Sequence, residues 1–329
     1  MTGQPEAALR LSAAVCTHAR PATLARALDS LAAQGAAVSE ILVVDNAPPD
    51  GATRDLVTGQ YPRVRYLQEP AQGLDFARNR ALSCARGDVV AFLDDDAVAS
   101  DNWASAMLDV FTQDPRVAIC TGRVEALGVD SEGERAFEAN GGFARGAVRI
   151  RLPADAARPL RGKPAPLIAW AVSVGSGCSY AVRRMVALEL GGFDEALDLG
   201  SILPGGGDHD LLWRALQAGY SVVYEPAAQA RHEHRASAAG AHQQIVGHQR
   251  ALLAFLAKHL VGGGDRAPMA GYTAWRLVKP GVRLVRRALG RDPLPAPVLA
   301  RLWWNCWAGL VAYPGARRVA RARRASQAR

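Results

Sequence analysis

The chain has 329 residues, which is enough to bury a large core and to form either two lobes or one enlarged α/β domain. Its formal net charge is +8, but residues 276–329 hold 13 of the Lys and Arg side chains and one acid, so this segment carries +12 and residues 1–275 carry −4. The basic character therefore belongs to the C-terminal segment, and we expect no nucleic-acid partner.

Four apolar runs, separated by helical patterns, predict strands at residues 11–16, 40–46, 64–67 and 87–93. Pro21 opens a helix after the first run, and a helix from Gly73 through Arg78 leads into the fourth. Repeated βα units of this kind predict a mostly parallel, nucleotide-binding sheet flanked by helices. Farther on, residues 222–224 predict a strand that precedes a loop at Pro226.

The fourth run ends in three consecutive acids, Asp94, Asp95 and Asp96. The last residues of a buried parallel strand emerge at the carboxyl edge of the sheet, where open α/β sheets bind ligands. Alternation sends Asp94 and Asp96 to one side and Asp95 to the other. Because adjacent carboxylates repel one another, we favour a divalent metal that carries a phosphorylated ligand over a solvated acidic turn.

Two common phosphate-binding motifs are missing from the sequence. No Gly-x-Gly-x-x-Gly follows the first strand, and no Gly-x-x-x-x-Gly-Lys-Ser/Thr occurs. Neither a dinucleotide fold nor a phosphate loop is therefore indicated. We expect phosphates to be held by a metal at Asp96 and by cations such as Arg20 and Arg78.

Cysteine usage and the first residues bear on the compartment. The five cysteines lack the paired spacing of a zinc site or a disulfide framework: Cys16, Cys84, Cys120, Cys178 and Cys306. Residues 1–10 contain acids and lack the basic and apolar regions of a signal peptide. We therefore expect a reducing, cytoplasmic location.

Several short motifs follow one another between residues 16 and 235: Cys-Thr-His-Ala-Arg-Pro at 16–21, Val-Val-Asp-Asn at 43–46, residues 73–79, Phe-Leu-Asp-Asp-Asp at 92–96, Gly-Gly-Phe-Asp-Glu at 191–195, residues 206–214, and His-Glu-His-Arg at 232–235. In order and spacing the series resembles the inverting nucleotide-sugar glycosyltransferases of family 2, which have the A-type glycosyltransferase fold. Two positions depart from the family pattern, His18 in place of a small polar residue and Gly207 in place of an acid.

The resemblance implies a donor site and a metal site. The residues expected to contact the donor nucleotide are Thr17, Arg20, Asp45, Asn46, Gly73, Arg78, Asp94 and Asp95. Asp96 would coordinate Mn²⁺ or Mg²⁺, with His232 or His234 completing the coordination sphere. The cation would neutralise the charge that develops on the departing nucleoside diphosphate.

The resemblance also implies an acceptor side. Inverting transfer needs a base on that face, and we expect Asp208, at a helix start after a glycine-rich run, to be this base. His209 and Asp210 are expected to point elsewhere, and Gly177 and Trp213 to contact the acceptor.

Each of these residues has a structural alternative. Asp45 and Asp208 could cap the helices that follow them. His232 and His234 could form an ordinary surface pair. Trp213 could pack in the core.

The C-terminal segment combines arginines with apolar residues. Residues 275–289 and 299–313 contain apolar side chains and four of the seven tryptophans, Trp275, Trp303, Trp304 and Trp307. Because the apolar stretch is shorter than the roughly 20 residues that span a bilayer, we expect it to lie on an anionic membrane surface. The alternative is a helical pair packed on the catalytic lobe.

These observations predict a glycosyltransferase catalytic domain at residues 1–260 and a basic, Trp-rich helical tail at 261–329. Residues 10–125 would form the donor half and 165–250 the acceptor half. The predicted reaction moves a sugar from a nucleoside-diphosphate sugar to a hydroxyl of a glycan or lipid-linked acceptor in envelope or capsule synthesis, at the inner face of the membrane. The Gln-x-x-Arg-Trp motif of processive synthases is absent, which favours addition of a single sugar. The alternatives are a sugar-phosphate nucleotidyltransferase and a silent module that binds nucleotide or membrane.

Overall fold

A computed structural model describes residues 8–262 and 266–327. Residues 1–7, which supply most of the expectation about a signal peptide, lie outside the described part of the chain. The strands are β1 (Leu11–Thr17), β2 (Glu40–Asn46), β3 (Val64–Glu69), β4 (Val89–Leu93), β5 (Ala97–Ala99), β6 (Val117–Ala126), β7 (Ile150–Leu152), β8 (Ser179–Arg183) and β9 (Ser221–His232). The four strands predicted in the first third of the chain are confirmed as β1 to β4.

The helices are α1 (Pro21–Ala32), α2 (Ala52–Gln60), α3 (Leu74–Cys84), α4 (Trp103–Gln113), α5 (Glu132–Ala139), α6 (Leu167–Val174), α7 (Arg184–Glu189), α8 (Gly207–Gln217), α9 (Ala238–Gly262), α10 (Arg266–Ala288) and α11 (Ala296–Gln327), with 3₁₀ turns at Gly35–Ala37 and Ala154–Ala157. Helix α1 shows why such segments form. Pro21 occupies its first turn, and Leu24, Leu28 and Leu31 line one buried face.

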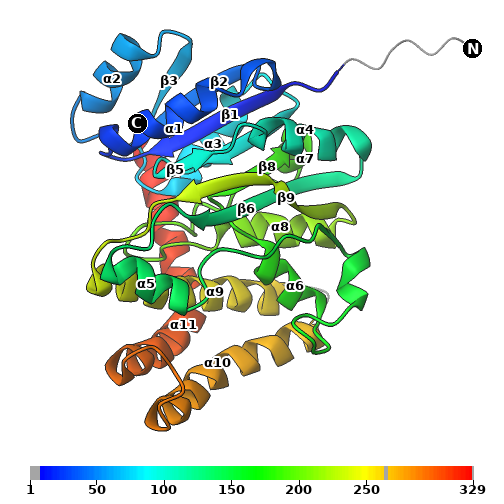
Figure 1. Cartoon of the computed structure of the whole chain (residues 1–329), viewed down its shortest axis with the longest axis vertical. Coiled ribbons are helices and arrows are strands. Elements are labelled where there is room, and N and C mark those ends of the chain that lie inside the picture. Colours follow the sequence, from blue (N-terminus) through cyan, green and yellow to red (C-terminus); the bar gives the residue numbers. More distant parts are fainter. Residues whose placement is uncertain (1–7, 263–265, 328–329) are drawn as a thin grey trace, which may run out of the picture.

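One sheet runs through the molecule in the order β3-β2-β1-β4-β8-β6-β9-β5, with β7 beside β9 (Figure 1). Strands β1 to β4 pair in parallel, as predicted. Beyond β4 the sheet is mixed, because β8 runs antiparallel to both β4 and β6. The α/β class is confirmed, but the expectation of a mostly parallel sheet holds only for the first half.

Helices cover both faces of the sheet, as period-two alternation requires. On β1, Leu11, Ala13 and Val15 pack in one core with side chains of α1 and α4. Ala14 faces the opposite core, which contains side chains of α3, α6, α8 and α9. The sheet is therefore buried on both sides, and ligands can reach it at its edges.

Strand β9 is longer than predicted. It continues through Pro226 to His232, because a shift in its register with β6 between Gly122 and Arg123 accommodates the extra residues. Its end pairs with β5, where His232 lies opposite Ala97. This pairing brings a histidine from the second half of the chain to the acidic turn at the end of β4.

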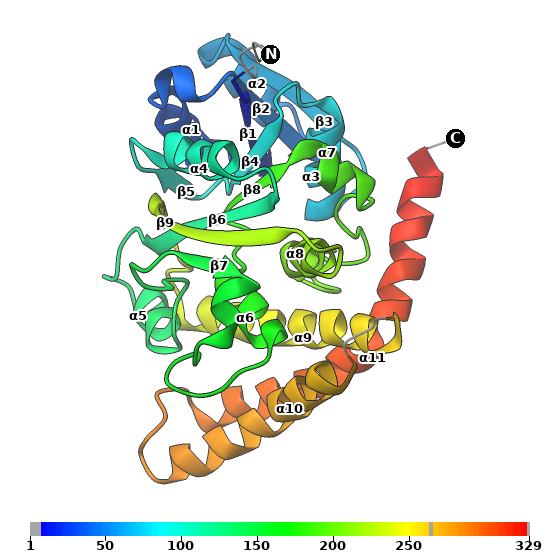
Figure 2. The same cartoon turned by 90° about the vertical axis from the view of Figure 1, so that its right-hand side faces the viewer.

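Helix α10 and the first half of α11 form a layer on the far side of α9 from the sheet, and the second half of α11 passes α9 and runs beside the rest of the molecule (Figure 2). Helix α11 approaches α9 so closely that a side chain on Gly309 would meet the carbonyl oxygen of Arg250 at 2.4 Å. Farther along α11, Ala316 packs near Phe76, and the Tyr313 hydroxyl donates to Asp194 at 2.6 Å. The packed-helix alternative therefore describes α11, whereas the outer face of α10 is exposed. Within residues 8–262 and 266–327, no helix is both long and apolar enough to cross a bilayer.

Candidate active site

Two of the three acids after β4, Asp95 and Asp96, have defined hydrogen-bond partners. Asp95 is buried and accepts from the Thr17 hydroxyl at 2.6 Å and from Arg20 at 3.2 Å. Arg20 also donates to Asp96 at 2.9 Å. The predicted Thr17, Arg20 and Asp95 are thus brought together, and they fix the backbone of the acidic turn.

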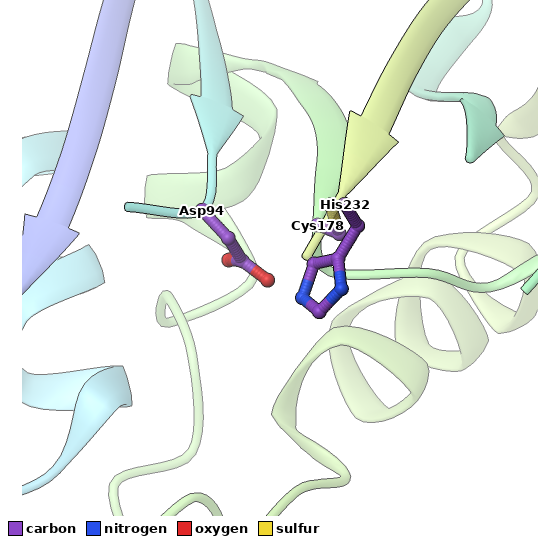
Figure 3. A group of neighbouring side chains, drawn as sticks. All are labelled: Asp94, Cys178 and His232. Atoms are coloured by element: carbon purple, nitrogen blue, oxygen red, sulfur yellow. The ribbon is translucent and has the colours of Figure 1, made fainter. Parts of the chain in front are cut away.

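Asp94 and Asp96 face a histidine. His232 Nε2 lies 3.1 Å from Asp96 Oδ1, and ligand atoms of Asp94, Cys178 and His232 lie within 4.8 Å of one another. Figure 3 shows the Asp94 carboxylate directed toward the His232 ring. Burial and the neighbouring Asp96 raise the pKa of Asp94 to about 6. Among the described residues, no side chain or amide donates a hydrogen bond to this carboxylate, so a cation would relieve the repulsion.

The donor set fits a hard divalent ion. Carboxylate oxygens suit Mn²⁺ or Mg²⁺, an imidazole nitrogen favours a transition metal over Mg²⁺, and a cysteine ligand selects softer metals. Asp94, Asp96 and His232 are therefore the residues that could hold the expected metal, and Cys178 lines the group.

His234 lies one layer behind His232. The Nδ1 atoms of the two rings are 3.3 Å apart, and His234 Nε2 is 2.8 Å from Glu138. Phe137 stacks on His234 at 4.6 Å between ring centroids, and Phe143 contacts His232 at 5.4 Å. Of the two histidines expected at the metal site, His232 lies beside Asp96 and His234 contacts the His232 ring, and the metal role of either stays a prediction.

Two predicted donor-side residues, Asp45 and Asn46, are the last two of β2. Asp45 lies beside Thr17 in the β1–β2 register and accepts from the Tyr66 hydroxyl at 2.8 Å, while its buried Oδ1 has no partner. Burial raises the pKa of Asp45. Asn46 has both amide ends bound to the backbone, accepting from Gly73 N at 2.9 Å and donating to Ala71 O at 2.6 Å. Asn46 thus positions the start of α3, at Gly73, instead of presenting a free amide.

Arg78 is buried behind the acidic turn. Its Nη1 donates to Asp75 at 3.1 Å and to Asp198 at 3.4 Å, and its guanidinium lies 5.3 Å from the Phe193 ring centroid. Burial raises the pKa of Asp75 well above its ordinary value, and Asp198 adds to this shift. The Arg78 guanidinium therefore lies between two acids, Asp75 and Asp198, that were not predicted from the sequence.

Asp208 lies on the other side of Arg78. A side chain at Gly177 would meet Arg78 Nη2 at 2.5 Å and Asp208 Oδ2 at 3.2 Å, so this glycine permits the approach of all three. His209 Nδ1 is 2.9 Å from Asp208 Oδ1, which corrects the expectation that His209 points elsewhere. Burial alone would raise the pKa of Asp208, but the neighbouring His209 and Arg78 outweigh it and hold the pKa below its ordinary value.

The start of α8 corrects the capping alternative for Asp208. The N-cap is Gly206, in a left-handed conformation with φ of 106°, and Asp208 lies inside the first turn. The absence of a side chain at position 207 has a steric explanation, because a Cβ there would lie 1.8 Å from Asp75 Oδ2. The departure from the family pattern at Gly207 is thus matched by the Asp75 carboxylate, which occupies the space of a side chain at that position.

Two other expectations on α8 have different outcomes. Trp213 is only 3% exposed and packs in the main core, so the structure favours the packing alternative over the predicted acceptor contact. Asp210 points away from Asp208, as expected, and is bound by Arg214 at 2.8 Å and by His259 at 2.8 Å.

Sequence reasoning missed Asp75, Asp198, Cys178 and the aromatic pair Phe137 and Phe143. Only Asp75 had a signal, because it lies three residues before Arg78 on one helix face. Asp198 has a left-handed backbone, with φ of 50°, in a loop far from α3 in the sequence. Such residues are brought to the site by tertiary packing alone.

The fold and these residues define an A-type glycosyltransferase architecture. A mannosyltransferase from Pyrobaculum calidifontis, solved with GDP-Man and Mn²⁺, aligns with a TM-score of 0.54 at 18% identity, over 97% of this chain and 75% of that one. GalNAc-T7 with UDP, GalNAc and Mn²⁺ aligns with a TM-score of 0.53 at 15% identity, over 88% of this chain and 59% of that one. At these identities the likeness concerns the fold.

Residues 12–191 match the model of glycosyl transferase family 2, and the chain belongs to that family. The succinoglycan biosynthesis protein ExoM of Rhizobium meliloti is 30% identical over 273 residues, which cover 79% of this chain and 75% of that protein. The pre-mycofactocin glycosyltransferase of Mycobacterium tuberculosis is 29% identical over 233 residues, 70% of this chain. The chain spans only 42% of the length of that second relative. The family predicted from the motifs is confirmed.

Proposed function

We propose that this protein transfers a sugar, with inversion, from a nucleoside-diphosphate sugar to an acceptor hydroxyl in the presence of Mn²⁺ or Mg²⁺. The observation that carries the proposal is the position of the dipeptide Gly177-Cys178. Gly177 adjoins Arg78 and Asp208, while the next residue, Cys178, lies in the group with Asp94 and His232. A candidate base and a candidate metal site therefore adjoin the same loop.

On the donor side, the chain offers a hydrogen-bond acceptor and a prepared carboxylate cluster. The unpaired Oδ1 of Asp45 can accept an N–H of the nucleotide base, which would satisfy a buried orphan atom. Arg20 orients Asp96, and His232 lies opposite it. When bound there, a divalent cation supplies neutralisation of the charge that the leaving diphosphate acquires.

On the acceptor side, Asp208 is the proposed general base. In an inverting displacement the acceptor hydroxyl attacks opposite the leaving group and loses its proton as the new bond forms. Because His209 and Arg78 hold the pKa of Asp208 low, its carboxylate is ionised, as a base must be, and the same effect makes it a weaker base than a free aspartate. Arg78, held between Asp75 and Asp198, places a buried positive charge near this carboxylate.

The acceptor class follows from a relative. The 30% identity to a protein named for succinoglycan biosynthesis supports an acceptor in an envelope or capsule glycan, or its lipid-linked precursor. We propose addition of a single sugar to it. The sugar and the base depend on the shape of the pocket.

The metal is tested by donor binding. Chelator should abolish binding of a nucleoside-diphosphate sugar, and Asp96→Asn should do the same while the protein remains folded by circular dichroism. Asp109→Asn, an exposed position on α4, is the matched control and should bind donor as wild type does. Equal donor affinity with and without metal would contradict the proposal.

The base is tested by Asp208→Asn, which keeps the side-chain volume. A positioned general base contributes about 100- to 10,000-fold, so turnover should fall by at least that range while donor affinity persists. A variant within about tenfold of wild-type turnover would exclude Asp208 as the base. Loss of donor affinity would instead assign Asp208 to the donor site. Release of nucleoside diphosphate by wild type separates an enzyme from a silent binding module.

A further inference from the structure

Helix α10 has an apolar face that is largely exposed among residues 8–262 and 266–327. Five apolar residues recur at alternating intervals of three and four along the helix and the residue just after it, and each is between 50% and 64% exposed: Trp275, Val278, Val282, Val285 and Leu289. We call these five residues the α10 stripe. This spacing places them on one side of the helix. Contiguous exposed apolar surface of this kind marks an interaction site.

Helix α11 adds aromatic surface beside the stripe. Trp303 lies against Gly281 of α10, with ring atoms 3.6 Å from the position of an added Cβ, and remains 43% exposed. Trp304, Trp307 and Val311 form a second exposed face, at 74%, 53% and 76%. Together α10 and the first half of α11 form the outermost layer of the molecule (Figure 2).

Cations surround the stripe. Lys279 Nζ lies 5.0 Å and Arg276 Cζ 5.8 Å from the Trp275 ring centroid. Arg286 and Arg287 are exposed on the same helix. The single acid of the segment, Asp292, is already engaged with Arg283 at 2.7 and 2.9 Å. The face is therefore apolar at its centre and cationic at its edges.

The apolar centre and cationic edges of this face determine which kind of partner can bind there. A second copy of the chain would bring two cationic faces together, and they would repel each other. A bilayer with anionic headgroups complements both the cations and the apolar stripe, and tryptophans favour the headgroup region. We propose that α10 and the first half of α11 dock this protein on the surface of an anionic membrane.

The docked face is joined to the candidate site by direct packing. Leu294, in the turn between α10 and α11, and Val298, in the first turn of α11, pack in one cluster with Phe137 of α5, and the Phe137 ring contacts His234. Few side-chain layers therefore separate the membrane surface from the metal group, as an acceptor embedded in that membrane would require. Docking itself does not depend on the proposed reaction and can be measured without donor or acceptor.

The test uses purified full-length protein and cosedimentation with vesicles. Vesicles that contain phosphatidylglycerol should bind the protein at least about tenfold more strongly than vesicles of phosphatidylcholine alone, and added salt should weaken the binding. Val282→Glu with Val285→Glu, in the stripe, should weaken it at least about tenfold. Met185→Glu, on α7 and 55% exposed, is the matched control and should bind as wild type does.

Four results would overturn the proposal. Wild type that binds neither kind of vesicle has no docking face for a bilayer. Binding that survives the double substitution, in protein with a wild-type thermal midpoint, belongs to another surface. A homodimer that dissociates in the double variant, detected by light scattering, would make the stripe an interface between copies. Equal binding to both kinds of vesicle would exclude the role of the cations.

Discussion

Replacing Gly207 by alanine tests how closely α3 and α8 approach below the candidate base. The added Cβ would lie 1.8 Å from Asp75 Oδ2 and 2.5 Å from its Cγ, where real Cβ contacts essentially never fall below 3.0 Å. Asp75 is fully buried, and its other oxygen is held by Arg78 at 3.1 Å. Overpacking of this kind costs about 1–3 kcal/mol, and alanine recovers at most about 1 kcal/mol in helix propensity. We expect a net loss of about 1–2 kcal/mol in the free energy of unfolding.

Urea unfolding followed by circular dichroism measures this loss. Gly59→Ala, in α2 with no atom within 4 Å of its added Cβ, is the matched control and should be neutral or stabilising by up to about 1 kcal/mol. Asp75→Ala should relieve the clash, so the double variant should be at least about 1 kcal/mol more stable than additivity predicts. Turnover should fall in the Gly207 variant, because displacement of the helix start by about 1 Å can cost about 100-fold. Stability within about 0.5 kcal/mol of wild type would refute the reasoning.

Two further predictions concern stability. Asp210→Asn should lower the free energy of unfolding by about 3 kcal/mol, because it leaves buried cations without their partner, whereas Asp109→Asn should change it by less than about 0.5 kcal/mol. Although burial opposes it, the hydrogen bond from His259 and nearby cations lower the pKa of Asp210, so its contribution to stability is present above the ordinary pKa of an aspartate and is lost as pH falls. The difference between the Asp210 variant and wild type should therefore shrink in acid, and a constant difference would contradict this. Deleting residues 296–327 should unfold the protein instead of merely releasing it from membranes, and a soluble truncation with a wild-type melting temperature would exclude this.

The parallel half of the fold was predictable because each of its strands has a local sequence pattern that identifies it as a strand. Strands β2 and β4 are continuous buried runs bounded by polar residues, and such runs need no distant partner to be recognised. Strand β8 has five residues and pairs antiparallel with β4 and β6, and its sequence does not reveal which neighbours it takes. Strand β9 contains Pro226, which predicts a loop, yet a register shift lets the strand continue.

Some residues of the candidate site were predictable from the sequence and others were not. Asp45, at the end of a predicted strand, and Asp94, directly after one, lie at the carboxyl edge of the sheet as predicted. The acids around Arg78 were not predictable, because Asp198 reaches it from a distant loop and the sequence gives no spacing for that contact. The sequence also left the packing partner of α11 undetermined, since small residues such as Gly309 allow close contact between helices but do not specify which helix is contacted.

The metal group depends on sheet register more than on any single motif. Asp96 and His232 come from opposite halves of the chain, and they meet because Ala97 pairs with His232 and the amide of Glu233 donates to Asp96 O at 2.9 Å. A slip of one residue between β5 and β9 would turn the imidazole to the other face of the sheet. The shift between β6 and β9 at Gly122 and Arg123 sets that register, and a Cβ on Gly122 would lie 2.2 Å from the carbonyl oxygen of Ala228. The irregularity near Pro226 is therefore part of what assembles the site, because it delivers His232 to the acidic turn on the correct face.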